Sequence, residues 1–326
     1  MGLVQPLQAE DQERPDFQTW LKGIRAQALA EGISEATVQR ALTNLEPDPR
    51  VLKFDRRQPE FVQTFEAYLT ARVTDTKVSK ARDFYQDNRT LLRALAEKYE
   101  VDPQYLVAFW GLESSFGLYQ GKYSVIRSLA TLAHDPRRTR FFTSELMSAL
   151  KVLDEGHIEP DLFVGGWAGA MGQNQFLPSS FLRYAQDFDG DGKKNIWSSR
   201  PDVWASIAYY LQRNGWQQGE SWGMPVVLTQ PIEFEQLKPA TVPGGCRALK
   251  YHTVKRPLSD WQAMGVQLPG PVADTSVEMA MVVPDEGEQR AYLVGPNFRT
   301  ILAYNCANKY AVSIGLMADA IVADPE

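Results

Sequence analysis

The sequence predicts a mainly α-helical protein of the α+β class, in which a small β-rich segment interrupts a helical chain. Apolar residues recur at intervals of three and four from Asp16 to about Val203, the spacing of one helix face. After Gly223 the pattern becomes an alternation of apolar and polar residues among frequent prolines and glycines. From Phe298 the helical spacing returns. The chain is therefore expected to re-enter its helical body near its end.

Start and stop signals support the helices of the first two thirds. Ser34 precedes one helical pattern, and in Asp102-Pro103 a potential capping oxygen is followed by a proline at the first helical position. Three glycines stand where a left-handed residue would end a helix: Gly117, Gly156 and Gly215.

Two stretches of alternating residues predict strands in the β-rich segment, namely 277–281 and 290–294. The changes of pattern divide the chain into an N-terminal helical region, a central core, a small β-rich domain and a C-terminal helical segment that returns to the core. We place these regions at residues 1–82, 83–222, 223–297 and 298–326.

Composition narrows the class of protein. The 326 residues are 44% hydrophobic and carry a formal charge of −6, which offers no basic surface for nucleic acid. No apolar run approaches the roughly 20 residues that cross a bilayer, and the first residues lack the basic and apolar segments of a signal peptide. We expect a protein soluble as given, without an export signal, which is either cytoplasmic or a mature or trimmed form.

The chain has two cysteines, Cys246 and Cys306, and three scattered histidines. This is too few for a disulfide scaffold and shows no zinc spacing. One disulfide in an oxidising compartment and two buried thiols both fit the sequence.

One carboxylate, that of Glu113, is predicted to face the core. Glu113 follows Phe109 by four residues and Trp110 by three, so a helix places it on their apolar face. Burial and the negative end of a helix that stops near Gly117 both disfavour the charged form, so the pKa of Glu113 is expected to be raised, as a general acid requires. The alternative is a structural Glu that pairs with a buried Arg or reaches solvent at the helix end.

Four motifs, taken in order, resemble one enzyme family. The segment 111–117, Gly-Leu-Glu-Ser-Ser-Phe-Gly, resembles the Glu-Ser motif of lysozyme-like lytic transglycosylases. The segments 166–180 and 187–192 and the pair Tyr304-Asn305 follow in the order and spacing of the membrane-bound lytic murein transglycosylase B family. The resemblance runs from about Asp16 to the end. It implies a lysozyme-like helical core with Glu113 as its single catalytic carboxylate.

The resemblance also implies residues that bind the glycan: Ser114, Trp167, Gln175, Tyr304, Asn305, Tyr310 and Tyr68. From the residues alone, Trp167 also fits a tight loop with a core tryptophan, and the tyrosines also fit plain helix packing. The sequence departs from the family at Gly166, where the family often has Ser, so a hydroxyl contact with the substrate is absent there or supplied by another residue.

An acidic loop predicts a calcium site. Asp187, Asp189 and Asp191 alternate and Gly192 follows, as in the first half of an EF-hand loop. The twelfth position holds Ser198 in place of the usual Glu, so we expect Asp202 to close the site.

The backbone carbonyl of Lys193 is expected to contribute to this site, and Asn195 directly or through water. The alternative is a solvated acidic turn. The resembled family carries an EF-hand-like calcium site here, which implies a structural Ca²⁺ and no organic cofactor.

The resemblance implies a periplasmic bacterial enzyme that acts on the glycan strands of peptidoglycan. Glycosidases usually need two carboxylates, and only Glu113 can be placed. In the family one carboxylate serves as acid and then as base, and the muramic acid closes a 1,6-anhydro ring. A hydrolytic lysozyme-type muramidase and a non-catalytic peptidoglycan-binding module are the alternatives. Endo or exo action, the need for stem peptides, protein partners and oligomeric state are not specified by the sequence.

Overall fold

The computed structural model describes residues 15–57, 63–242, 244–282 and 290–323. The fold is mainly helical, which confirms the predicted class. Its α-helices are α1 Phe17–Ala30, α2 Glu35–Leu42, α3 Pro49–Arg57, α4 Phe65–Arg72, α5 Asp75–Asp87, α6 Arg89–Tyr99, α7 Pro103–Ser114, α8 Val125–His134, α9 Thr139–Asp154, α10 Pro178–Tyr184, α11 Arg200–Arg213, α12 Leu258–Ala263, α13 Pro296–Tyr304 and α14 Asn308–Val322. Its strands are β1 Tyr123–Ser124, β2 Val164–Gly165, β3 Gly223–Leu228, β4 Arg256–Pro257, β5 Val266–Gln267, β6 Glu278–Val282 and β7 Arg290–Val294, and short 3₁₀ helices are η2 Pro160–Leu162, η3 Phe234–Leu237 and η4 Arg247–Tyr251.

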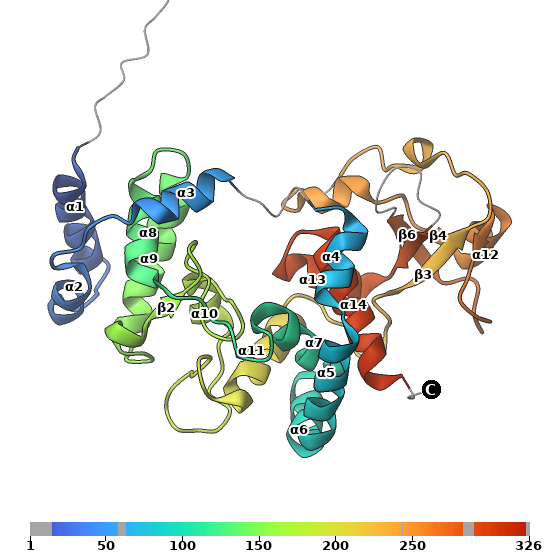
Figure 1. Ribbon diagram of the computed structural model, residues 1–326, viewed down its shortest axis with the longest axis horizontal. Coiled ribbons are helices and arrows are strands. Elements are labelled where there is room, and N and C mark those ends of the chain that lie inside the picture. The colour runs from blue at the N-terminus through green and yellow to red at the C-terminus, as the bar shows by residue number, and fades with distance from the viewer. Residues whose placement is uncertain (1–14, 58–62, 243, 283–289, 324–326) are drawn as a thin grey trace, which may run out of the picture.

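The first helices lie at two separate places in the molecule. Helices α1 and α2 pack together on the left of Figure 1. There α2 contacts α9, and α3 contacts α8. Helices α4 and α5 instead contact α14, which comes from the far end of the chain. The division at residues 82, 222 and 297 stays a prediction.

Helix α7 lies in the middle of the fold, in contact with α5, α6, α11 and α14 (Figure 1). Pro103 begins it, as predicted. The expected side-chain cap by Asp102 is wrong, because its carboxylate accepts hydrogen bonds from Trp216 Nε1 at 2.9 Å and from the Gly219 amide at 3.1 Å. The predicted cap of α2 is confirmed, since Ser34 accepts a hydrogen bond from the Thr37 amide. The predicted left-handed glycines after α7, α9 and α11 all have positive φ.

The stretch between α9 and α11 is less helical than its apolar spacing predicts. It contains only α10, η2 and β2, and β2 pairs with β1 in an antiparallel ribbon. The glycines explain the difference. Gly169, Gly172, Gly190 and Gly192 all have positive φ, which the interior of a helix does not accept.

The β-rich segment forms a five-stranded antiparallel sheet in the order β4-β6-β7-β3-β5. Alternate residues of the sheet pack into two different hydrophobic cores, as the period of two predicts. Tyr292 and Val294 of β7 belong to the large helical core, whereas Ala291 and Leu293 join a smaller cluster with Trp261 of α12. The sheet is therefore anchored to the helical body by one face.

Cys246 and Cys306 form a disulfide, which decides between the two possibilities that the sequence left open. The bond joins the segment before η4 to the turn between α13 and α14, across 60 positions of sequence.

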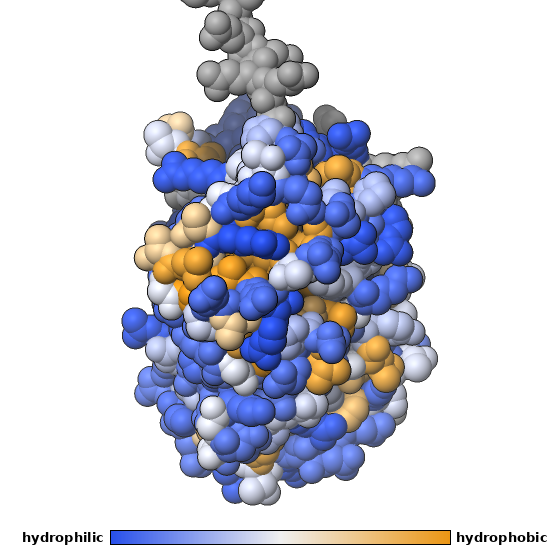
Figure 2. Space-filling model, turned by 90° about the vertical axis from the view of Figure 1, so that its left-hand side faces the viewer, coloured by the Kyte–Doolittle hydropathy of each residue, from blue (hydrophilic) through white to orange (hydrophobic). Residues whose placement is uncertain are grey.

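The face seen in Figure 2 is largely hydrophilic and carries a patch of apolar side chains. Helices α1 and α2 lie on this side of the molecule (Figure 1). Across the residues that the structure describes, none of the helices combines the length and the hydropathy that a membrane span needs.

Candidate active site

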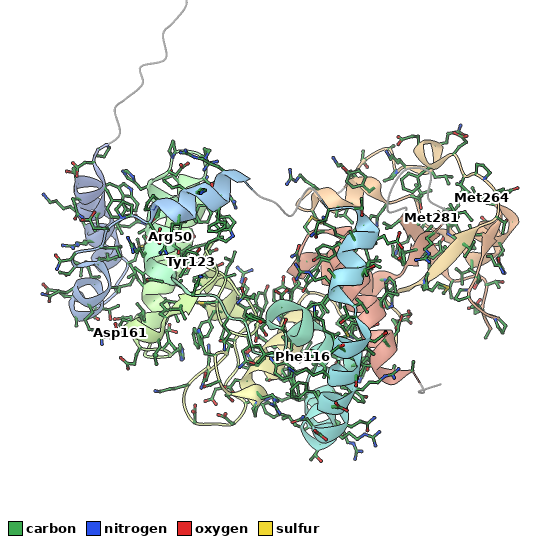
Figure 3. The ribbon with its side chains drawn as sticks, in the orientation of Figure 1. Arg50, Phe116, Tyr123, Asp161, Met264 and Met281 are labelled. Carbon is green, nitrogen blue, oxygen red and sulfur yellow. A yellow bond between two sulfur atoms is a disulfide. The ribbon has the colours of Figure 1, made fainter. Side chains whose placement is uncertain are left out.

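The carboxylate that the sequence singles out stands near the C-terminal end of α7, a largely buried helix. Residues 105–112 of α7 are all buried, and Glu113 is partly exposed. The chain then turns sharply, because Ser115, Phe116 and Gly117 all have positive φ (50°, 63° and 83°). Phe116, at the centre of Figure 3, marks this turn. Left-handed residues in succession are costly outside glycine, so tertiary contacts must hold the turn.

Ser114 adds two local hydrogen bonds at this turn. Its side chain is 1% exposed, and its hydroxyl donates to the Trp110 carbonyl at 3.1 Å and accepts from the Gly117 amide at 3.0 Å. This hydroxyl therefore shapes the turn after Glu113. A direct contact between Ser114 and substrate stays a prediction.

Tyr310 completes the site from the other end of the chain. Its hydroxyl donates a hydrogen bond to Glu113 Oε1 at 2.5 Å, across 197 positions. Burial first, and then the negative charge of Glu113, raise the pKa of Tyr310 well above its ordinary value. Tyr310 therefore remains protonated at neutral pH and serves as a hydrogen-bond donor to the carboxylate.

Two further predicted tyrosines lie at the same place. Tyr304 of α13 donates to the Asn174 carbonyl at 2.7 Å, and burial followed by the charge of Glu113 raises its pKa. Tyr68 of α4 is 9% exposed and is near enough to contribute to the raised pKa of Tyr310. The fold thus brings Tyr304 of α13 and Tyr310 of α14 to the carboxylate, and Tyr68 of α4 to the vicinity of Tyr310.

Asn305 lies at the C-terminal end of α13 and is exposed. Within the described residues its side chain makes none of the hydrogen bonds found, and its backbone carbonyl accepts from the Ala307 amide at 2.8 Å. It is available to a ligand from solvent.

The loop after β2 presents Gln175 in a left-handed conformation with φ of 50°. Its Nε2 donates to the carbonyl of Gly172 at 2.8 Å and to that of Gln120 at 3.3 Å. A Cβ atom built on Gly166 would lie 3.6 Å from Gln175 Oε1, an ordinary contact. Nothing in the backbone therefore requires glycine at position 166.

Trp167, in the loop after β2, contacts helix α3. Its ring stacks on Phe54 of α3 with centroids 6.5 Å apart, and Phe54 meets Tyr123 edge-on at 6.1 Å. Figure 3 shows Tyr123 beside Arg50, whose guanidinium lies 5.5 Å from the Tyr123 ring. Phe54 is 41% exposed, so this aromatic group reaches solvent.

Sequence reasoning missed the two polar residues before Gln175. Gln173 accepts from Trp110 Nε1 at 2.6 Å and donates to the Trp197 carbonyl at 2.7 Å. Asn174 is fully buried and donates to the Val203 carbonyl at 3.0 Å. Both residues bind this loop to neighbouring helices. Three consecutive amides in a loop of small residues were the available signal.

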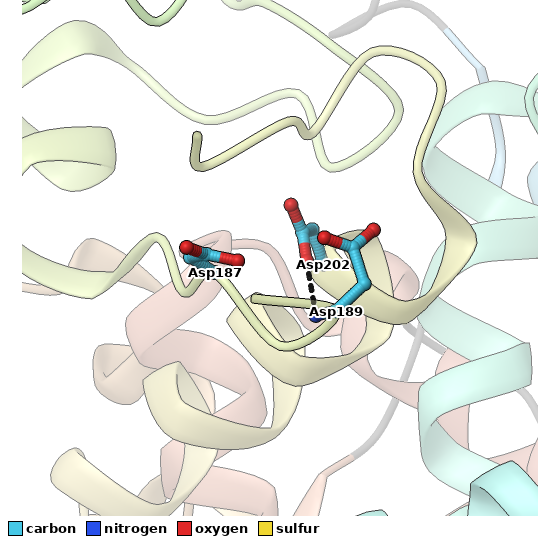
Figure 4. A group of neighbouring side chains, drawn as sticks. All are labelled: Asp187, Asp189 and Asp202. Carbon is cyan, nitrogen blue, oxygen red and sulfur yellow. Dashed lines mark hydrogen bonds between the residues drawn. The ribbon is translucent and has the colours of Figure 1, made fainter. Parts of the chain in front are cut away.

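The acidic loop brings three of its predicted carboxylates together. One oxygen each of Asp187, Asp189 and Asp202 lies within 4.8 Å of the others, as Figure 4 shows for the side chains. Burial first raises the pKa of Asp202, and the charge of Asp189 adds to this. Asp191 lies outside the group and accepts from the Lys193 amide at 2.8 Å. Three converging carboxylates are a donor set that suits a hard cation.

Comparison with known proteins adds to this geometry. Residues 16–319 match the family model described as "Transglycosylase SLT domain". The chain belongs to this family. This confirms the resemblance drawn from the sequence motifs.

Among curated relatives of this transglycosylase family, the chain is similar to membrane-bound lytic murein transglycosylase B of Escherichia coli (strain K12). The two are 30% identical over 251 residues, which cover 76% of this chain and 65% of the relative. The match therefore spans somewhat less than two thirds of that protein's length.

Solved structures of family members share the fold. SltB3 from Pseudomonas aeruginosa, in complex with NAG-NAM-pentapeptide, is 38% identical with a TM-score of 0.84, covering 94% of this chain and 79% of that one. The Escherichia coli lytic transglycosylase Slt35, in complex with calcium, is 26% identical with a TM-score of 0.75 and 98% coverage of each chain. The lysozyme-like lytic transglycosylase fold is thereby confirmed.

Proposed function

We propose that this protein is a lytic transglycosylase that cleaves the β-1,4 bond between N-acetylmuramic acid and N-acetylglucosamine in bacterial peptidoglycan. The observation that carries the proposal is the hydrogen bond from Tyr310 to Glu113 at the end of the buried helix α7. It joins the carboxylate that the sequence motif singles out to a tyrosine from the returning C-terminal segment. The relatives named for this activity, and the one bound to NAG-NAM-pentapeptide, support the choice of substrate.

Glu113 acts first as an acid and then as a base. It gives its proton to the glycosidic oxygen, so the bond from that oxygen to C1 of the muramic acid breaks. The resulting carboxylate then takes the proton of the 6-hydroxyl of the same sugar, whose oxygen bonds to C1. A 1,6-anhydro ring and a free hydroxyl on the departing sugar result. No water enters, so a second carboxylate to activate water is unnecessary.

The residues around Glu113 support binding of sugar rings. We propose that Tyr68, Tyr304 and Tyr310 line the reacting end of the glycan cleft, with Asn305 at its rim. Trp167 and Gln175 bind the strand from the loop after β2, because an aromatic face and amide groups are what pyranose rings and N-acetyl groups accept. Ser114 adds a contact only through its backbone or a rearranged turn.

We further propose that Asp187, Asp189 and Asp202 hold a structural calcium ion, with Asp191 and the Lys193 carbonyl completing an EF-hand-like loop. A bound cation would neutralise charges that repel one another. It would hold the loop before α11, a helix that contacts α7. The calcium complex of Slt35 supports this assignment.

The disulfide supports an oxidising compartment such as the periplasm, where disulfides persist.

The deciding experiment is mass spectrometry of purified peptidoglycan after digestion by the wild-type protein and by Glu113→Gln. We expect muropeptides one water lighter than hydrolysis products with the wild type and none with the variant, whose amide cannot exchange the proton.

Two results would contradict this. Ordinary reducing ends from the wild type would identify a hydrolytic muramidase. Tight binding of glycan by both proteins without any product would identify a binding module.

A further inference from the structure

The segment around η4 clamps the turn that leads into α14. Cys246 is disulfide-bonded to Cys306, and the Ala248 amide donates to Cys306 Sγ at 3.4 Å. The side chain of Asn308 donates from Nδ2 to the Ala248 carbonyl at 3.2 Å. Its Oδ1 lies 2.9 Å from Nε2 of His252, which donates in the neutral tautomer with hydrogen on Nε2. Four contacts thus bind the β-rich segment to the start of one helix.

That helix has no side-chain cap of its own. The N-cap position of α14 is Ala307, with no side-chain hydrogen bond to the first turn. Alanine is among the weakest N-cap residues, and uncapped helix ends fray. Asn308 is the first residue of α14. The four contacts, which we call the clamp, therefore act at the end of the helix that is least stable by itself.

The first turn of α14 also carries the partner of the catalytic carboxylate. Tyr310 stands two residues after Asn308, is 4% exposed, and bonds to Glu113. A shift of this turn would therefore move the Tyr310 hydroxyl directly. Displacements of about 1 Å at such a position cost up to about a hundredfold in rate.

His252 fits its part in the clamp as a neutral group. It is 7% exposed, and its ring lies 5.6 Å from that of Phe298. Burial lowers its pKa, and the nearby positive charge of Arg299 lowers it further. The ring is uncharged near neutral pH, which matches a hydrogen bond to an amide oxygen.

We propose that Asn308, His252 and the Cys246–Cys306 disulfide are positioning residues of the active site, which hold the first turn of α14 so that Tyr310 reaches Glu113. The β-rich segment then sets catalytic geometry at a distance. This inference rests on the proposed function, since it concerns the efficiency of that same site.

The test compares variants that loosen α14 at its two ends. Asn308→Ala and the double variant Cys246→Ser/Cys306→Ser weaken the clamp. Asp319→Ala is the matched control, because Asp319 accepts from Trp222 Nε1 at 2.8 Å and so connects the other end of α14 to the start of the β-rich segment. Kcat, KM and their pH profiles are measured on purified peptidoglycan, and thermal unfolding shows that each variant is folded.

We expect kcat to fall roughly tenfold in both clamp variants with KM within about twofold of wild type. The alkaline limb of the kcat profile should move to higher pH, because a hydrogen bond donated to a carboxylate favours its ionised form and is weakened here. Asp319→Ala should retain wild-type kcat and profile. Reduction of the wild-type disulfide should reproduce the loss, and the double Ser variant should not respond to the reductant.

Unchanged kcat and pH profile in folded clamp variants would overturn the inference, and so would an equal loss in Asp319→Ala. Failure of the proposed function would look different, because the wild-type protein would then release no anhydro products.

Discussion

One tyrosine hydroxyl contacts the carboxylate of Glu113. The sequence places this acid on an apolar helix face, where pairing with a buried Arg was an alternative. In the structure, Tyr310 donates a hydrogen bond to Oε1. A neutral donor orients a carboxylate without neutralising it, which suits the proposed role of Glu113 in exchanging a proton with substrate.

Replacing Tyr310 by Phe tests this at the smallest scale. The ring stays, and one hydrogen bond to a charged group is lost, worth about 1.5–3 kcal/mol. We expect kcat to fall roughly tenfold to a hundredfold, and the free energy of unfolding to fall by no more than about 3 kcal/mol. Steady-state kinetics on purified peptidoglycan checks this, and a Tyr310→Phe protein with wild-type kcat would exclude the role.

The carboxylate of Asp319 predicts how the stability of the protein depends on pH. Burial raises the pKa of Asp319 above its ordinary value of 3.8, although Trp222 Nε1 donates to it. The folded state therefore loses stability as pH rises through this raised pKa. Below the pKa that Asp319 has in the unfolded chain, nothing is lost. Asn keeps an acceptor for Trp222 and never ionises.

We accordingly expect Asp319→Asn to be more stable than wild type near about pH 7 and equal to it near about pH 3.5. Denaturant unfolding at the two pH values measures the difference. The same stability gain at both would mean that ionisation is not its cause.

At the scale of elements, the turn after α7 depends on one glycine. Gly117 has φ of 83°, and a Cβ atom there would lie 2.5 Å from Gln173 Oε1, a side chain fixed by Trp110 and Trp197. Gly156 ends α9 with φ of 75° and open space around its Cβ position. Alanine at either position would be strained by the left-handed backbone conformation. Only at Gly117 would its Cβ atom also collide with a neighbouring side chain.

Gly156→Ala should therefore cost about 1–2 kcal/mol of unfolding free energy. Gly117→Ala should cost about 1–3 kcal/mol more and should also lower activity, because the turn carries Glu113. Denaturant unfolding compares the pair. Equal losses would show that Gln173 moves aside freely.

At the scale of the whole molecule, a calcium ion in the acidic loop before α11 is expected to raise the stability. If Asp187, Asp189 and Asp202 bind calcium, an ion at a hundred times its Kd adds about 2.7 kcal/mol to stability. Thermal unfolding should show a higher midpoint with calcium than with chelator, and Asp202→Asn should lose most of this response. Asp161→Asn is the control, an exposed acid in η2. A wild-type midpoint that ignores calcium would exclude the site.

Much of this protein can be predicted from its sequence. Periodicity of three and four predicts the helices, and alternation predicts strands β6 and β7, because both patterns reflect which side chains face a core. The Glu-Ser motif and the acidic loop are local, so their residues are visible before folding. The family follows from those motifs taken together.

Only the tertiary structure decided how distant segments meet. Residues 308–322 lie beside α7 and residues 65–72 lie beside α14, Cys246 pairs with Cys306, and Tyr310 reaches Glu113. Asp102 bonds to Trp216 in place of capping its helix. These contacts depend on side chains far apart in the chain, whose pairing no local spacing encodes, since long-range packing selects among partners that local propensity leaves equivalent.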